Sequence, residues 1–228
     1  MSREFELIDV CHTVEHGMIT YKGLPAPVIS DFLSREESST RYAPGTEFHI
    51  GKIEMVANTG TYLDSPFHRY ARGKDLASLD LYSIANVDGV VVRCLYRTEI
   101  TEGAFRDVDV NGKAVLVHTG WDRHWRKEEY SSGNHPYLTE AAATYLAKNN
   151  AVLVGIDSFN IDATRDGNRP VHSVLLGHDI PIVEHLCGLD DLPDSGFKFF
   201  AVPVKVRNFG TFPVRAFGIV STANLPSS

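Results

Sequence analysis

Three short, mainly apolar runs constrain most strongly how this chain of 228 residues can fold. They occupy residues 90–95, 113–118 and 151–156, and none shows the alternation expected of a strand with one solvated face. Such runs are typical of strands buried on both faces of a sheet. Between the second and third runs, Thr139 is a predicted N-cap of a helix whose alanines and Leu146 share one stripe. This strand–helix–strand order predicts a right-handed crossover between two parallel strands.

The rest of the chain adds further predicted strands and one more helix. Residues 5–11 and 180–183 are expected to be strands, and Pro170 is expected to open a helix that ends at Leu176. A strand-like run, residues 48–57, is expected to point Phe48, Ile50 and Met55 inward. Residues 197–206 and 212–220 are predicted to form two long strands joined as a hairpin, with Gly210 in the turn. With no repeat and no linker, the sequence predicts one α/β domain over residues 1–228 with a mixed β-sheet core.

The composition excludes some classes of function. A net charge of −7 and a sequence pI of about 5.8 argue against nucleic-acid binding. No apolar run approaches the ~20 residues of a membrane span, so no membrane partner is expected. Cys11, Cys94 and Cys187 are too few and too scattered for a disulfide framework or a thiolate zinc cage, and they fit a reducing compartment. A cytoplasmic protein with a small-molecule substrate is therefore expected.

Residues 58–68 hold the first candidate site. Gly60 permits a turn, and Ser65 followed by Pro66 is typical of a helix start. This places Asp64 at the mouth of the helix and His68 one turn inside it. Such a carboxylate and imidazole can share a metal, a water or a substrate proton. Alternatively, Asp64 is only a cap and His68 only a surface residue.

Other polar residues follow the ends of predicted buried strands, where ligand sites of α/β sheets usually lie. Of these, Asp64, His172 and Glu184 would form an oxygen-rich site with one imidazole. That mixture of ligands suits manganese, magnesium or zinc. His172 also fits a capping or core role, and Glu184 a solvated strand end. The further candidates are His118 with Trp121, and Asp157 with Ser158.

Residues 58–68 resemble the signature of the cyclase family, which includes bacterial kynurenine formamidase and isatin hydrolase. The family pattern His-x-Gly-Thr-His-x-Asp-x-Pro-x-His is matched by Gly60, Thr61, Asp64, Pro66 and His68. His172 and, twelve positions later, Glu184 resemble the family's downstream metal-binding pair. The segments 119–121 and 213–215 resemble further family landmarks.

The resemblance implies a swivelling β/β/α fold that assembles as a homodimer or homotetramer. It also implies hydrolysis of an amide or cyclic amide by water activated on a divalent metal, manganese or zinc. Asp64, His172 and Glu184 would be the metal ligands, and His68 the general acid/base. Tyr21, Asn58 and Trp121 are the expected substrate-binding side chains. Tyr21 and Trp121, with Phe209 and Phe212, would either form an aromatic wall for a flat aromatic amide or pack the core or a subunit interface.

Two departures from the family pattern qualify this expectation. Asn58 and Tyr62 stand where the pattern has its first two histidines. An amide is a weak neutral ligand and a phenol is mostly protonated at neutral pH, so one metal position should be lost. Tyr62 would then have a catalytic role of its own, as hydrogen-bond donor to a developing oxyanion. The alternatives are a metal-free small-molecule-binding pseudoenzyme on the same scaffold and a metal-dependent lyase.

Overall fold

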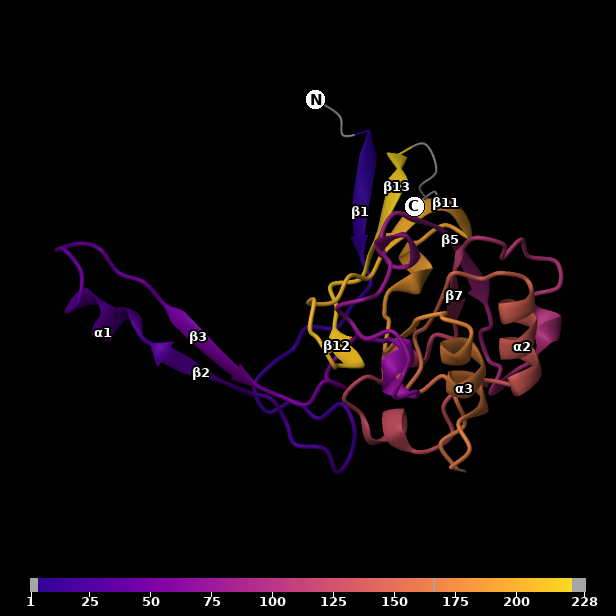
Figure 1. The fold of residues 1–228 in the computed structure, drawn as a ribbon, viewed down its shortest axis with the longest axis horizontal. Helices are drawn as coiled ribbons and strands as arrows, with labels where there is room; N and C mark the ends of the chain where they lie inside the picture. The colour runs from indigo at the N-terminus through magenta and orange to yellow at the C-terminus, as the bar shows by residue number, and fades with distance from the viewer. Residues whose placement is uncertain (1–3, 166, 223–228) are drawn as a thin grey trace.

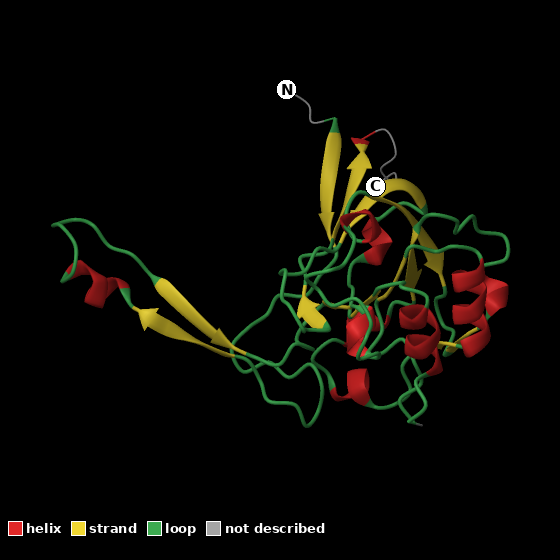
Figure 2. Ribbon diagram, in the orientation of Figure 1, coloured by secondary structure: helices red, strands yellow, loops and turns green. Residues whose placement is uncertain are grey.

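The computed structural model describes residues 4–165 and 167–222, and within them a curled mixed sheet of nine strands forms the body (Figures 1 and 2). Across the sheet the strands are β1 (Phe5–Asp9), β13 (Phe217–Ser221), β11 (Ser195–Phe200), β5 (Val87–Arg93), β7 (Ala114–His118), β9 (Leu153–Ile156), β10 (Ile182–Glu184), β4 (Tyr62–Asp64) and β12 (Thr211–Pro213). The central strands from β5 to β10 run parallel, and the outer pairs are antiparallel. The predicted α/β class with a mixed sheet is confirmed.

The predicted buried strands form the centre of this sheet. Every residue of β7 and β9 is buried, and the two strands pair in parallel as predicted. Helices α2 (Glu140–Lys148) and α3 (Pro170–Gly177) pack against one face of the sheet, where Leu146 and Leu175 join its core. The Thr139 side chain accepts a hydrogen bond from the Ala142 amide, which confirms the predicted N-cap of α2. Opposite the helices, Phe197 and Phe199 of β11 help to fill a second core.

The strand predicted within residues 48–57 forms as β3 (Ile50–Glu54), but the prediction that Phe48 and Ile50 point into the core is wrong. β3 pairs with β2 (Val28–Leu33) in a two-stranded ribbon that leaves the body, with the short helix α1 (Arg35–Ser39) near its tip (Figure 1). Phe48 is 51% exposed and Ile50 46% exposed, while Met55 is half-buried where the ribbon rejoins the body. Their apolar character does not indicate burial in the body, because β3 pairs with β2 in a ribbon that lies outside it.

The predicted hairpin between residues 197 and 220 is also wrong. β11 pairs directly with β13, whereas β12 pairs with β4 at the far edge of the sheet. Gly210 has a different task from turning a hairpin, because a Cβ added there would lie 2.6 Å from the Cα of His68. The absence of a side chain therefore lets the strand that follows approach residues 64–68 closely.

The remaining elements are short. β6 (Glu99–Ile100) pairs with β8 (Tyr137–Leu138). The 3₁₀ turns are Pro66–His68, Leu81–Ser83, Glu102–Ala104, Trp121–His124, Glu128–Ser131 and Leu189–Asp191. The helix predicted at Pro66 is thus a single 3₁₀ turn, and Ser65 makes no side-chain capping bond. No helix among the described residues is both long and apolar enough to cross a membrane.

Candidate metal centre and substrate cavity

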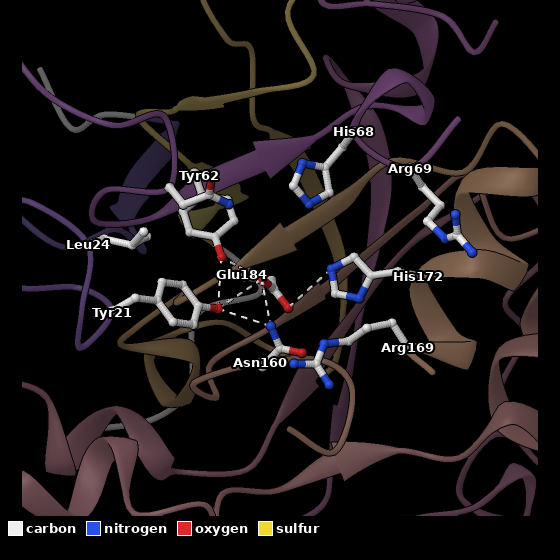
Figure 3. Close-up of a pocket in the computed structure, with 10 residues that line it drawn as sticks. Tyr21, Leu24, Tyr62, His68, Arg69, Asn160, Arg169, His172 and Glu184 are labelled. Carbon is white, nitrogen blue, oxygen red and sulfur yellow. Dashed lines mark hydrogen bonds and ion pairs between the residues drawn. The ribbon is translucent and has the colours of Figure 1, made fainter. Parts of the chain in front are cut away.

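A cavity of about 280 Å³ opens where β4, β10 and the start of α3 converge (Figure 3). Asp64 ends β4, Glu184 ends β10, and His172 lies in the first turn of α3. The structure thus brings together residues that are 120 positions apart in the sequence. The cavity is lined by Tyr21, Leu24, Asn58, Tyr62, His68, Arg69, Asn160, Arg169, His172 and Glu184.

Asp64 and Glu184 each direct a carboxylate oxygen toward the imidazole of His172, and the three residues are here called the ligand cluster. His172 Nε2 lies 3.7 Å from Asp64 Oδ2 and 3.8 Å from Glu184 Oε1. All three side chains are at least nine-tenths buried. Asp64 Oδ2 is buried and accepts no hydrogen bond from any described residue. An unsatisfied carboxylate oxygen is costly in such a place unless a cation or a proton compensates it.

Asp162, which the sequence reading missed, fixes the orientation of His172. His172 Nδ1 donates to Asp162 Oδ2 over 2.6 Å, and the amides of Val171 and His172 donate to the same carboxylate. This leaves Nε2 to face the ligand cluster. Burial opposes a charge on His172, but the bond with Asp162 and the carboxylates of Asp64 and Glu184 raise its pKa to about 10. A carboxylate that holds the far nitrogen of a histidine is the usual outer shell of a metal-binding imidazole.

His68 is linked to Asp64 through Thr211, a second residue that the sequence reading missed. The Thr211 hydroxyl donates to Asp64 Oδ1 and lies 2.8 Å from His68 Nδ1. Since that hydroxyl proton goes to Asp64, the network assigns the ring proton of a neutral His68 to Nδ1. His68 Nε2 is then free to accept a proton. Gly210, directly before Thr211, permits the close approach on which this arrangement depends.

Tyr21, Tyr62 and Asn160, here called the phenol network, surround the other oxygen of Glu184. The Tyr62 hydroxyl donates to Glu184 Oε2 over 2.6 Å, and the Tyr21 hydroxyl lies 2.9 Å from that of Tyr62. Asn160 Nδ2 donates to the Tyr21 hydroxyl over 3.0 Å (Figure 3). Burial, followed by the charge of Glu184, holds the pKa of Tyr62 well above its ordinary value. Tyr62 is therefore a neutral hydrogen-bond donor.

Two separations at His172 permit a shared divalent cation. His172 Nε2 lies 3.7 Å from Asp64 Oδ2 and 3.8 Å from Glu184 Oε1, both below the ~4.2 Å that two ligands at about 2.1 Å from one ion can span. Asp64, His68 and His172 also each offer an atom within 4.8 Å of the others, so His68 lies close enough to be a further ligand. The position next to Asn58 and Tyr62 does not fit a cation, because Tyr62 already donates its proton to Glu184 Oε2.

The other predicted residues are divided between the cavity and the core. Tyr21 and Asn58 line the cavity. Trp121 does not, because its ring packs with Tyr130 and Phe159 and its Nε1 donates to the Tyr130 carbonyl over 3.1 Å. The geometry therefore gives no support to a substrate contact by Trp121. Asp157 accepts hydrogen bonds from the amides of Thr119 and Gly120 and thus holds the turn after β7.

Comparison with known proteins bears on this geometry. The family model described as "Putative cyclase" matches residues 8–163, about two thirds of the chain. The matched range contains Asp64, His68 and Asp162, whereas His172 and Glu184 lie beyond it. The chain is 27% identical over 220 residues to the kynurenine formamidase of Bacillus cytotoxicus, covering 92% of this chain and 96% of that protein. It is 29% identical over 177 residues to the kynurenine formamidase of Polaromonas naphthalenivorans, covering 76% of each.

Solved structures share the fold. An isatin hydrolase bound to the product analogue thioisatinate superposes with a TM-score of 0.80 at 21% identity, covering 96% of this chain and 94% of that one. A structure described as a potential metal-dependent hydrolase with cyclase activity gives a TM-score of 0.76 at 24% identity, covering 94% and 98%. These likenesses confirm the predicted fold.

Proposed function

The chain belongs to the cyclase family, and from this premise we propose that it is a metal-dependent hydrolase of an amide or cyclic amide. A single divalent cation, manganese or zinc, would be held by Asp64, His172 and Glu184. The observation that carries this proposal is the buried Asp64 Oδ2, which faces His172 Nε2 and accepts no hydrogen bond from the described residues. The kynurenine formamidase relatives support the choice of an amide as the substrate class.

In this proposal a cation in the ligand cluster supplies Lewis-acid polarisation of the substrate carbonyl and lowers the pKa of water to ~7. His68 Nε2 takes the proton of the attacking water and returns it to the leaving nitrogen. Thr211 and Asp64 hold the His68 ring in the tautomer that this step needs. A base positioned in this way contributes ~10²–10⁴-fold to the rate.

The phenol network would act on the substrate rather than on the cation. Tyr62 is proposed to donate a hydrogen bond to the oxygen on which negative charge develops, since its raised pKa keeps the proton in place. In the structure this proton goes to Glu184, so the donation requires Tyr62 to exchange that partner for the substrate. Tyr21 and Asn58 line the same cavity and would position the rest of the substrate.

The test begins with protein purified without added metal. Bound metals are measured by elemental analysis, and manganese and zinc are then titrated while hydrolysis of a panel of formanilides and lactams is followed. We expect about one ion per chain and an activity that disappears on chelation and returns with metal. Activity that survives exhaustive chelation would refute the metal-dependent mechanism. Product analysis separates a hydrolase from a lyase on the same scaffold.

One observation favours a second candidate function, a metal-free binding protein. Tyr21, Tyr62 and Asn160 already satisfy Glu184 Oε2 with neutral donors, and such a network could also hold a small carbonyl or carboxylate ligand. A full-occupancy ion on the ligand cluster in an unsoaked crystal would exclude this candidate.

A cytoplasmic location is part of the main proposal, supported by three free cysteines.

A further inference from the structure

The substrate cavity has two sides of different chemistry, and the proposed reaction leaves one of them without a role. Tyr21 and Tyr62 line one side, next to Glu184 Oε2. Arg69 and Arg169 line the cavity on the other side of Glu184 (Figure 3). In the proposed reaction neither arginine holds the cation or moves the proton. The cationic side of the cavity therefore has no assigned ligand.

Arg69 is anchored at the rim of the cavity by its inner atoms. It directly follows His68, and its Nε donates to the Ser173 hydroxyl over 3.2 Å. Its Cζ lies over the ring of Tyr70, 5.3 Å from the ring centroid. Among the described residues, no carboxylate pairs with Arg69 and no acceptor engages its two Nη atoms. The outer donors of this guanidinium thus remain available to a ligand.

Arg169 occupies a position that an arginine rarely takes. It is the N-cap of α3, with φ 49° and ψ 55°, in the left-handed region where residues other than glycine are uncommon. N-caps favour Ser, Thr, Asp and Asn, and the Arg169 side chain makes no capping bond. Instead its Nη1 donates to the Ala163 carbonyl over 2.9 Å, and the residue lines the cavity. Neither capping nor backbone preference explains an arginine here, so its role lies in its side chain.

Ser173 connects the two arginines to each other. Its hydroxyl accepts the bond from Arg69 Nε and donates to the Arg169 carbonyl over 2.9 Å. Ser173 also directly follows His172, a member of the ligand cluster. Two arginines that are 100 positions apart in the sequence are thus held at one end of the cavity, beside the ligand cluster.

The charge of this wall is opposite to the charge of the chain. The chain carries a net charge of −7, yet Glu184 is the only carboxylate among the described residues that line the cavity. Its two oxygens already accept bonds from the Tyr62 hydroxyl and the Ile161 amide. A cleft lined by one sign of charge attracts ligands of the opposite sign. Arginine binds a carboxylate through two parallel hydrogen bonds, so a carboxylate fits Arg69 and Arg169.

The ligand cluster lies between the aromatic side and the cationic side. Tyr62 donates to Glu184 Oε2, whereas His172 faces Glu184 Oε1. Arg69 is held one residue beyond His172, through Ser173. A substrate whose carbonyl lies at the ligand cluster would therefore extend to both sides of its scissile bond. The cavity of about 280 Å³ is near the lower end of the ~300–1,000 Å³ of ligand pockets, so both parts of the substrate are small.

We propose that Arg69 and Arg169 form a carboxylate-binding subsite, and that the substrate is an amide whose scissile carbonyl separates a small aromatic group from a carboxylate. This inference rests on the proposed amide hydrolase function and names its substrate class. Half-amides of a dicarboxylic acid with an arylamine and N-aroyl amino acids both have this chemistry. A formyl amide does not, because its acyl side carries only hydrogen.

N-phenylsuccinamate illustrates the reaction. Water adds to the amide carbonyl and the C–N bond breaks, which gives succinate and aniline. The proton that His68 takes from the water goes to the leaving nitrogen. Throughout, the second carboxylate of the acyl group stays on Arg69 and Arg169 and holds the carbonyl at the ligand cluster.

Matched substrates test the subsite on the metal-loaded protein. N-phenylsuccinamate is compared with N-phenylpentanamide, a neutral anilide of similar length. Hippurate is compared with N-propylbenzamide, a pair in which the amide is reversed. We expect kcat/KM to be about 10–100-fold higher for at least one anion than for its neutral partner, since a hydrogen bond to a charged group contributes a factor of this size.

Substitution of the arginines should remove this preference. Arg69→Gln and Arg169→Gln should each lose most of it, mainly through a higher KM for the anion, because the subsite binds the substrate without taking part in the bond-breaking step. The matched control is Arg72→Gln, which removes the same charge three residues beyond Arg69, from an exposed side chain outside the cavity. It should keep the full preference. Circular dichroism checks that each variant is folded.

Calorimetry gives a readout that does not depend on turnover. The probe is 3-benzoylpropionate, which has a ketone in place of the amide and cannot be hydrolysed, and butyrophenone is its neutral analogue. The protein as purified should bind 3-benzoylpropionate, and Arg69→Gln should weaken this binding by about 10–100-fold. Binding that is insensitive to both arginine variants would mean that the carboxylate binds the cation, which overturns the proposal.

The remaining outcomes separate the subsite from the proposed function. Equal kcat/KM for each anion and its neutral partner would overturn the subsite while the hydrolase function stands. A preference that survives both arginine variants, or that Arg72→Gln loses equally, would do the same. If no amide is hydrolysed but 3-benzoylpropionate binds through Arg69, the hydrolase function fails and the carboxylate subsite stands.

Discussion

Glu184 belongs to both the ligand cluster and the phenol network, and its two carboxylate oxygens have different partners. Glu184 Oε2 accepts a short bond from Tyr62, with Tyr21 and Asn160 within 3.4 Å. Glu184 Oε1 accepts from the Ile161 amide and otherwise faces His172, beside the unsatisfied Asp64 Oδ2. In the half of the cavity with the phenol network, protein donors thus satisfy Glu184 Oε2. In the half with the ligand cluster, Asp64 Oδ2 accepts no hydrogen bond from the described residues. In the proposed function a cation would be held only in the second half, so Asn58 and Tyr62, which stand where the family pattern has two histidines, would change one half of the site and leave the other half suited to metal.

Asp64→Asn should break the ligand cluster most completely. The substitution keeps the side-chain volume and an acceptor for Thr211 but removes the charge that a cation needs. We expect bound metal to be lost and kcat/KM to fall by more than the ~10²–10⁴-fold that a general base alone provides. Elemental analysis and turnover measure the two losses. Asp88→Asn, which alters an exposed strand carboxylate, is the control, and full metal content in Asp64→Asn would contradict the assignment.

His68→Gln should separate the proton-transfer step from the metal site. We expect kcat to fall by ~10²–10⁴-fold with the metal content unchanged, because His68 moves a proton and the ligand cluster holds the ion. Thr211→Val removes the hydroxyl between His68 and Asp64 and should produce a smaller loss of the same kind. If His68→Gln instead loses its metal, His68 is a ligand together with Asp64 and His172, which their proximity permits.

The sequence predicted features whose signals are local, and it missed features that depend on contacts between distant segments. α2 and the central strands were predicted because their signals are local: Thr139 caps its own helix, and β7 and β9 are apolar throughout. The projecting ribbon of β2 and β3 was missed because the exposure of Phe48 and Ile50 depends on the position of the whole ribbon relative to the body. Asp162 and Thr211 were missed because each works through a residue from another segment. No local pattern marked Asp162, because it lies eight residues before Pro170, outside the capping position, and yet accepts the amides of Val171 and His172.

Tyr62→Phe should test whether the phenol network acts on the substrate. Loss of the hydroxyl removes the proposed oxyanion donor, so kcat should fall by about 10²–10³-fold while bound metal is unchanged. Tyr62→His restores the family pattern at this position and should raise metal affinity, with a smaller loss of activity than Asp64→Ala. Unchanged turnover in Tyr62→Phe would make Tyr62 only a packing residue that satisfies Glu184.

Asp162→Asn should weaken the ligand cluster without removing a ligand. His172 would lose the charged partner of its Nδ1, and outer-shell changes of this kind lower metal affinity by ~10–100-fold. Metal titration monitored by calorimetry measures the change, with Asp179→Asn as a control that breaks an exposed ion pair. Activity should return at saturating metal, whereas activity lost even at saturation would show that Asp162 does more than orient His172.

Acid should destabilise the rings of His12, Trp125 and His185 that pack behind the phenol network. Of the substitutions considered, His12→Phe should have the smallest effect. The rings of Tyr21 and Tyr62 pack against His185, and His12 stacks on Trp125 beside it, with ring centroids 3.9 Å apart. Burial, aided by the Arg126 charge, lowers the pKa of His12 to about 4, and burial lowers that of His185 well below its ordinary value.

The sign of the effect follows from these shifts. A histidine that is neutral when folded but has an unfolded pKa of ~6.5 contributes stability that is fully present above pH ~6.5 and is lost as the pH falls toward 4. For His12 the loss amounts to about 3 kcal/mol at most, at ~1.36 kcal/mol for each pKa unit. His12→Phe keeps a ring on Trp125 and removes the titration, so its free energy of unfolding should fall less between pH 7 and pH 4.5 than that of the wild type. Denaturant titrations followed by tryptophan fluorescence measure the difference. The control is His49→Asn, which alters an exposed histidine next to β3. Parallel pH profiles for wild type and His12→Phe would mean that the acid sensitivity does not arise at His12, which leaves His185, whose pKa burial lowers well below its ordinary value, as the titrating histidine of this support.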